Sequence, residues 1–168
     1  TSRREKLYIE ALDRFVPKDD PKKKDGPAES KDAEREAKKK RSERFISDLE
    51  KILDEFPDDI EAKAMIVVQM WMADRYGVKL TSRHAVNALM GEIFSVDPMH
   101  PAHHYRIHLW DSPRPQNALE SSAKCGPSSP GIAHMWHMPG HIYSKLKRYG
   151  DAAWQQEASA RVDHAHMI

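Results

Sequence analysis

The chain has 168 residues, enough for a domain with a substantial hydrophobic core. Its 27 basic and 26 acidic residues nearly cancel, so the sequence has no overall field that would attract nucleic acid or an anionic membrane surface. A single cysteine, Cys125, excludes an internal disulfide and a cysteine-based zinc cluster, and it leaves a cytoplasmic or a periplasmic location equally open.

The first elements are predicted from apolar periodicity. Leu7, Ala11 and Phe15 recur at helical spacing and predict an N-terminal helix over residues 1–16. Residues 17–28 combine prolines, a glycine and alternating charges, a composition typical of a mobile linker. We expect residues 29–168 to form a helical repeat domain.

That domain begins with a helix over residues 29–56, whose basic run at 38–41 is flanked by glutamates and is best interpreted as a solvated face. The next helix, 60–76, is preceded by an aspartate cap and followed by Gly77. Further helices are predicted over 82–94, from Pro101 onward and up to Lys124, and a turn over 125–131 precedes a final helix pair that separates near 148–150.

No segment alternates polar and apolar residues over a convincing length, so the predicted fold is all-α. No apolar run approaches the roughly 20 residues that span a bilayer, so we expect a soluble protein without a membrane partner. The sequence starts without methionine and stops within a helical pattern, which we interpret as a piece of a longer protein.

The spacing of the predicted helices favours a short solenoid of about three helical hairpins. Prolines end successive helix pairs at intervals near the 34-residue tetratricopeptide (TPR) period. In the last pair, Trp136, Gly140 and Tyr143 match the TPR spacing W-x₂-L-G-x₂-Y, and Ala152 falls at the packing position of the second helix. Pro139 departs from this pattern, and it either kinks the helix near Met138 or begins it.

Nine of the ten histidines lie in residues 100–168, mostly in two blocks, 100–111 and 134–143. Spacings of three and four residues place each block on one helix face, and the first helices of stacked hairpins line a shared concave groove. Imidazole with one carboxylate suits a divalent transition metal such as zinc, copper, nickel or iron. The predicted metal ligands are His104, His108, Asp111, His137 and His141. The other residues predicted to line the groove are His100, His103, His134, Tyr143, His164 and His166.

Three alternatives stay open at this point. The histidines are equally well explained as packed members of the helix walls that hydrogen-bond to the backbone or to carboxylates. The groove is also suited to a protein or peptide partner without any metal, as helical repeats commonly are. A hydrolase or redox enzyme with a histidine general base is a third interpretation, and the sequence leaves enzymatic activity undecided.

Two motifs resemble those of a group of bacterial TPR-repeat proteins with the patterns H-P-G-x-x-H-Y-x-I-H and H-M-P-x-H-I-[FY]. Residues 100–108 read HPAHHYRIH, with Ala102 at the glycine of the pattern, and residues 137–143 read HMPGHIY. The similarity also takes in residues 8–12 and 57–62. It implies a TPR-like helical fold and no particular activity.

Overall fold

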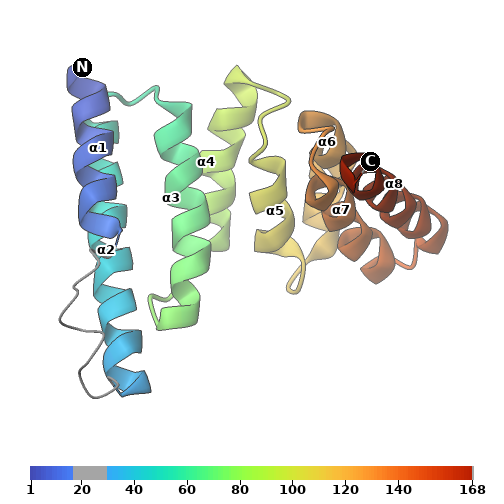
Figure 1. The fold of residues 1–168 in the computed structure, drawn as a ribbon, viewed down its shortest axis with the longest axis horizontal. Helices are drawn as coiled ribbons and strands as arrows, with labels where there is room; N and C mark the ends of the chain where they lie inside the picture. The colour runs from blue at the N-terminus through green and yellow to red at the C-terminus, as the bar shows by residue number, and fades with distance from the viewer. Residues whose placement is uncertain (17–29, 168) are drawn as a thin grey trace. The chain divides into compact units, whose positions relative to one another are not determined.

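The computed structural model describes residues 1–16 and 30–167, and side chains up to Ala165. Within these ranges every regular element is helical, which confirms the all-α prediction (Figure 1). The linker predicted at 17–28 lies outside the described residues. None of the described helices is both long and apolar enough to cross a membrane.

The chain divides into two compact units, Thr1–Ser82 and Arg83–Ile168. Unit 1 contains α1 (Arg3–Phe15), α2 (Lys31–Glu55), α3 (Ile60–Ala73) and the short 3₁₀ helix η2 (Asp74–Tyr76). Unit 2 contains α4 (Arg83–Val96), α5 (His103–Trp110), the 3₁₀ helix η3 (Pro115–Ala118), α6 (Leu119–Ser128), α7 (Ala133–Lys145) and α8 (Tyr149–Met167).

The N-terminal helix α1 belongs to unit 1 and packs along the C-terminal half of α2 (Figure 1). Leu7 and Ala11 are buried, and the ring of Phe15 stacks on Phe45 with 4.4 Å between centroids. This differs from the sequence prediction, which set residues 1–16 apart from a repeat domain of 29–168. The apolar stripe of α1 packs on a helix that begins at Lys31, and a contact between segments that are distant in the sequence leaves no local signal.

The start of α3 is fixed by Asp59, as the cap pattern predicts. Its Oδ1 accepts hydrogen bonds from the amides of Glu61 and Ala62, both at 3.1 Å, and Arg4 Nε donates to Oδ2 at 2.6 Å. Burial alone would raise the pKa of this carboxyl, but the bonds from Arg4 and the Ala62 amide outweigh it and hold the pKa below its usual range. At the other end, η2 is closed by Gly77, whose φ of 95° favours glycine.

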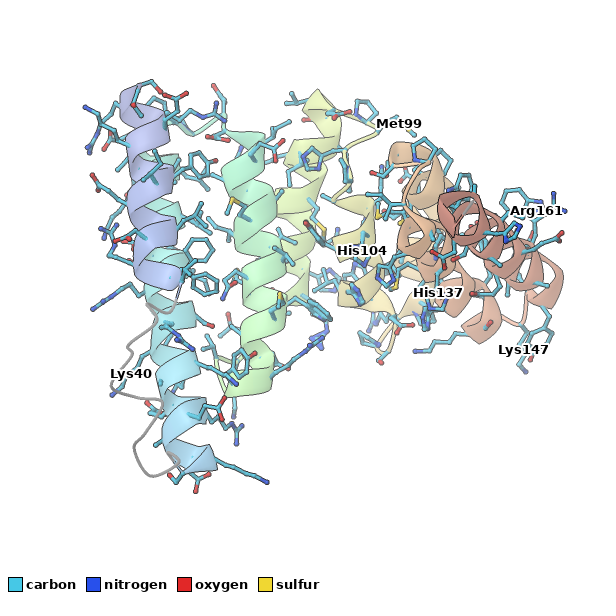
Figure 2. All side chains as sticks on the ribbon, viewed as in Figure 1. Lys40, Met99, His104, His137, Lys147 and Arg161 are labelled. Atoms are coloured by element: carbon cyan, nitrogen blue, oxygen red, sulfur yellow. The ribbon has the colours of Figure 1, made fainter. Side chains whose placement is uncertain are left out.

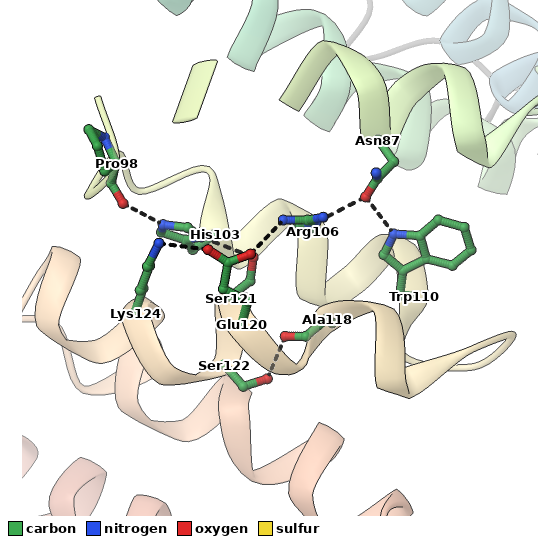
Figure 3. A network of polar contacts seen from close by, with 10 residues as sticks. All are labelled: Asn87, Pro98, His103, Arg106, Trp110, Ala118, Glu120, Ser121, Ser122 and Lys124. Atoms are coloured by element: carbon green, nitrogen blue, oxygen red, sulfur yellow. Dashed lines mark hydrogen bonds and ion pairs between the residues drawn. The ribbon is translucent and has the colours of Figure 1, made fainter. Parts of the chain in front are cut away.

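In unit 2, α5 is held between α4 and α6 by polar contacts from one face (Figure 3). Asn87 Oδ1 on α4 accepts hydrogen bonds from Arg106 Nε and Trp110 Nε1, each at 2.9 Å. His103 Nε2 donates to the carbonyl of Pro98 at 3.0 Å, and its Nδ1 accepts from Ser121 Oγ at 2.9 Å. Because positions 103, 106 and 110 share this face, the helix presents positions 104 and 108 in a different direction.

Helices α5 and α6 form one hairpin, α7 and α8 form the next, and α5 lies beside α7. One local prediction was wrong, and one of the two alternatives for Pro139 is excluded. The turn expected at 125–131 is shorter, because α6 continues to Ser128 with Pro127 in its last turn. Pro139 does not begin α7: the helix starts at Ala133 and runs through the proline to Lys145. Gly126 faces Trp136 so closely that a methyl group there would collide with the indole.

Candidate metal centre

Five histidines from α5 and α7 form a continuous row, which we call the histidine row: His104, His108, His134, His137 and His141. Adjacent ring centroids are 4.6 Å apart for His108 and His104, 4.9 Å for His104 and His134, and 5.9 Å for His134 and His137. The row ends with His137 and His141, whose centroids are 4.8 Å apart. Figure 2 shows His104 and His137 on the facing sides of the two helices. The row arises because the histidine faces of α5 and α7 meet where the two hairpins stack.

Three members of the row form the tightest cluster, which we call the first histidine group: His104, His108 and His134. One ring nitrogen from each lies within 4.8 Å of the other two. His104 Nε2 and His108 Nε2 are 2.9 Å apart, a separation produced by the i, i+4 spacing within α5. His104 and His108 are half-buried, whereas His134 is exposed, so the group opens to solvent on the His134 side.

The surroundings of His104 favour its neutral imidazole form. Burial lowers the pKa of His104, and the nearby rings of His108 and His134 lower it further, to about 4. At neutral pH the His104 ring therefore holds no extra proton, and one of its nitrogens offers a free lone pair. A neutral ring is the form that ligates a metal ion.

The remaining two members, which we call the histidine pair, are His137 and His141. Their Nε2 atoms are also 2.9 Å apart, again from an i, i+4 spacing. Gln156 on α8 contacts the far side of His137: its Nε2 donates to the His137 carbonyl at 3.2 Å, and its Oε1 lies 2.6 Å from His137 Nδ1. An amide oxygen can only accept, so Nδ1 of His137 carries the proton and Nε2 has the lone pair.

Asp111 lies near the row but does not join either cluster. Its carboxylate forms an ion pair with Lys145 at 2.8 Å, and the Lys145 ammonium also donates to the Asp111 carbonyl at 2.8 Å. The pKa of His141 is lowered by partial burial and by the His137 ring, and the Asp111 charge acts in the opposite direction. The predicted ligand Asp111 is thus an electrostatic neighbour of His141 that is held by a lysine.

Several residues predicted to line the groove lie elsewhere. His103 is fully buried and stacks on Phe94 with 4.0 Å between centroids. Because both of its ring nitrogens are hydrogen-bonded, it is a core residue without a free lone pair, and burial lowers its pKa. His100 is also buried, and its Nδ1 accepts from the Ala102 amide at 3.0 Å in the turn before α5.

The other three predicted groove residues are on α7 and α8. Tyr143 is buried under the guanidinium of Arg148, 4.9 Å from its ring centroid. His164 is exposed near the C-terminal end of α8. The side chain of His166 lies outside the described residues.

The sequence pattern places His134 on the groove wall rather than among the ligands, and it gives no indication of Gln156. The signal for His134 was present in its i, i+3 spacing to His137. Gln156 had no signal, because an amide on the following helix matches no metal-binding pattern. Cys125 is buried, and burial raises the pKa of its thiol to about 12, so it is not a nucleophile.

Comparisons with known proteins support the fold. No protein-family model matches the chain, and no curated protein is significantly similar to it. Among solved structures, "MamA RS-1 ArsTM double mutant" superposes with a TM-score of 0.62 at 8% identity, over 99% of this chain and 97% of that one. "MamA MSR-1 C2" superposes with a TM-score of 0.57 at 12% identity, over 74% of this chain and 69% of that one. MamA is a TPR-repeat protein, so the chain has a TPR-like helical fold.

Proposed function

We propose that this TPR-like domain binds a divalent transition metal ion through His104, His108 and His134. The observation that carries the proposal is the convergence of three imidazole nitrogens within 4.8 Å of one another. Three histidines are an established ligand set for zinc, with a fourth position left to water or to a substrate. The same nitrogens suit copper, nickel and iron.

The required adjustment is small for the two rings of α5 and larger for His134, whose ring nitrogen lies within 4.8 Å of the other two. Two zinc–nitrogen bonds of about 2.0–2.1 Å at a tetrahedral angle place the nitrogens about 3.3 Å apart. His104 Nε2 and His108 Nε2 are 2.9 Å apart, so the ion requires the two rings to open by a few tenths of an ångström. Without a metal, one of these nitrogens donates a hydrogen bond to the other. A bound ion would lie in place of that proton, and the donor ring would then carry its proton on Nδ1 and stay neutral.

The open side of the group decides what the ion can do. His134 is exposed, so water, an anion or a side chain of a partner could reach an ion held by this group from the His134 side. A zinc-bound water is far more acidic than bulk water, and this is the chemistry that the ion would supply. The chain itself contributes the three nitrogens, and the contacts of α5 with α4 and α6 keep two of them in place.

The experiment uses protein purified without a histidine tag, stripped with a chelator and titrated separately with zinc, copper and nickel. We expect binding that is weakened at least tenfold in His108→Ala and in His134→Ala. His164→Ala removes an exposed histidine outside the row and serves as the matched control. Equal metal affinity in the wild type and the three single variants would contradict the proposal. So would a wild type that binds metal no more tightly than the double variant His108→Ala/His134→Ala.

A second candidate function is a protein-interaction scaffold without a metal, and the TPR-like fold favours it. Tyr149 and Trp154 on α8 are exposed aromatic side chains that such a partner could contact. The two candidates differ in one measurement. A scaffold shows no increase in unfolding temperature on adding metal, whereas a metal at 100 times its dissociation constant stabilises the folded state by about 2.7 kcal/mol.

A further inference from the structure

We infer that the histidine pair, His137 and His141, forms a second metal site beside the first, with Gln156 as its positioning residue. The histidine row then takes two divalent ions rather than one. The inference rests on the proposed function, because it assigns the same chemistry to the other end of the row. It is argued from contacts that the first histidine group does not share.

The geometry of the pair repeats that of α5. In both helices two histidines stand four residues apart, and in both their Nε2 atoms are separated by 2.9 Å. Two imidazoles one helical turn apart reach a single ion from one helix. His134 belongs to the first histidine group, and its ring centroid is 5.9 Å from that of His137. The row therefore offers two sets of nitrogens that adjoin without sharing a ligand.

Gln156 gives the pair a feature that packing alone does not require. Metal-ligating histidines almost always donate their second ring N–H to an acceptor, which fixes the tautomer and the ring orientation. His137 does this: Nδ1–H donates to Gln156 Oε1 at 2.6 Å, which directs the Nε2 lone pair toward His141. The bond from Gln156 Nε2 to the His137 carbonyl sets the orientation of the amide, because only one arrangement satisfies both contacts.

The protonation of the pair also fits an incoming ion. Since His137 Nε2 has the lone pair, His141 Nε2 carries the proton in the 2.9 Å contact between them. When an ion binds, this proton leaves to solvent and Nδ1 of His141 takes one up, so the ring stays neutral and no net proton is released. His137 needs no change of tautomer.

The space for Gln156 is provided by Gly140 on α7. A methyl group at this position would collide with the Gln156 amide nitrogen and come within 3.2 Å of its Cδ. Because Gly140 has no side chain, the Gln156 amide can reach His137. The TPR spacing also places glycine at this position. Gly140 is therefore required for the contact between Gln156 and His137, but it is not independent evidence for a metal.

The second site has two protein nitrogens and the first has three, so we expect zinc to fill them in two steps. His141 is exposed, and the remaining coordination positions of its ion face solvent. Asp111 is held by Lys145, so it contributes its charge at a distance and not as a ligand. The second step is expected to be weaker than the first.

The test is a zinc titration of tag-free wild-type protein, followed by isothermal calorimetry and by elemental analysis after gel filtration. We expect two zinc ions for each chain in two resolved steps. His141→Ala should lose the weaker step and keep the tighter one. Gln156→Ala should weaken the second step by about 10- to 100-fold, the usual effect of removing such a positioning contact. Gln156→Glu should retain the second step, because a carboxylate accepts the same hydrogen bond.

Gln116→Ala, an exposed glutamine of η3, is the matched control and should bind as the wild type does. One zinc per chain, lost in His108→Ala and kept in His141→Ala, would overturn this inference and leave the proposed function standing. One zinc lost in both variants would mean a single shared site, which also overturns it. No zinc at all would overturn the proposed function itself. An unchanged second step in Gln156→Ala would remove Gln156 from the site.

Discussion

Gly140 on α7 faces Gln156 on α8 with no room for a methyl group between them. Gly140→Ala must therefore turn the flexible glutamine away from His137, while the backbone oxygen of Ala152 stays at an ordinary 3.7 Å from the new Cβ. Alanine favours a helix over glycine by about 1 kcal/mol, so we expect the unfolding temperature to hold or rise while the second zinc step weakens.

Gly91→Ala is the control for this substitution, because nothing lies within 4 Å of a Cβ at that helical position. It should raise the unfolding temperature and leave both zinc steps unchanged. Circular dichroism melts and the zinc titration provide the two measurements. A fully retained second step in Gly140→Ala would contradict the role given to Gln156.

Metal-free protein should lose stability on mild acidification because of His104. Its pKa is about 4 in the folded state and about 6.5 in an unfolded chain, so the unfolded state binds more protons between these values. The contribution of neutral His104 to the free energy of unfolding is fully present above pH 6.5. It is lost as the pH falls toward 4. We expect a decrease of about 1–2 kcal/mol in the free energy of unfolding between pH 7 and pH 5.

Urea unfolding at several pH values, with chelator present, measures this effect. His104→Gln should flatten the pH dependence, and His164→Gln, which changes an exposed histidine, should not. An identical slope in the wild type and in His104→Gln would show that other groups cause the acid sensitivity.

Lys147, in the turn between α7 and α8, has a φ of 59°. A side chain in this left-handed region crowds the backbone, and glycine does not. Lys147→Gly should therefore stabilise the protein by about 0.5–1 kcal/mol. Ala153→Gly, at an exposed helical position of α8, should have the opposite sign, with a loss of about 1 kcal/mol. The denaturant midpoints of Lys147→Gly and Ala153→Gly test these two expectations. A loss of stability in both variants would show that Lys147 is not strained by its left-handed backbone.

Asp59→Ala should destabilise unit 1. The substitution removes the side-chain acceptor of the Glu61 and Ala62 amides and leaves Arg4 without its partner at 2.6 Å. Loss of a helix cap costs about 1–2 kcal/mol. Asp58→Ala, one residue earlier and exposed, should change the unfolding free energy by less than about 0.5 kcal/mol. Urea midpoints followed by circular dichroism give the comparison, and equal effects would contradict the capping role.

The helical fold was predictable because its signals are local. The Asp59 cap, the Gly77 terminus and the apolar stripes appear within one or two turns of chain, and the structure has helices at these places. The TPR spacing in α7 also predicted that the first helices of two hairpins would lie side by side, as α5 and α7 do. The packing of α1 on α2 could not be predicted in this way, because the two contacting faces are far apart in the sequence.

The candidate site was predictable in part for the same reason. Helical periodicity was enough to place His104, His108, His137 and His141 on two faces, and the structure brings these faces together. It placed His103 on the groove wall and could not show that His103 belongs to the core, because the burial of one of two adjacent histidines depends on the helices that pack against α5. The buried contacts with Ser121 and Pro98 make His103 a core residue. The role of Gln156 depends on the register between α7 and α8, which the sequence does not specify.

Cys125 allows the same unit to be followed chemically. Its covered, neutral thiol does not react with an alkylating reagent while α6 stays folded. The extent of labelling of this one sulfur therefore measures the fraction of molecules in which unit 2 has opened, and no cysteine has to be introduced for the experiment. Because bound metal would hold α5 and α7 together, the labelling rate reports how far ion binding slows that opening.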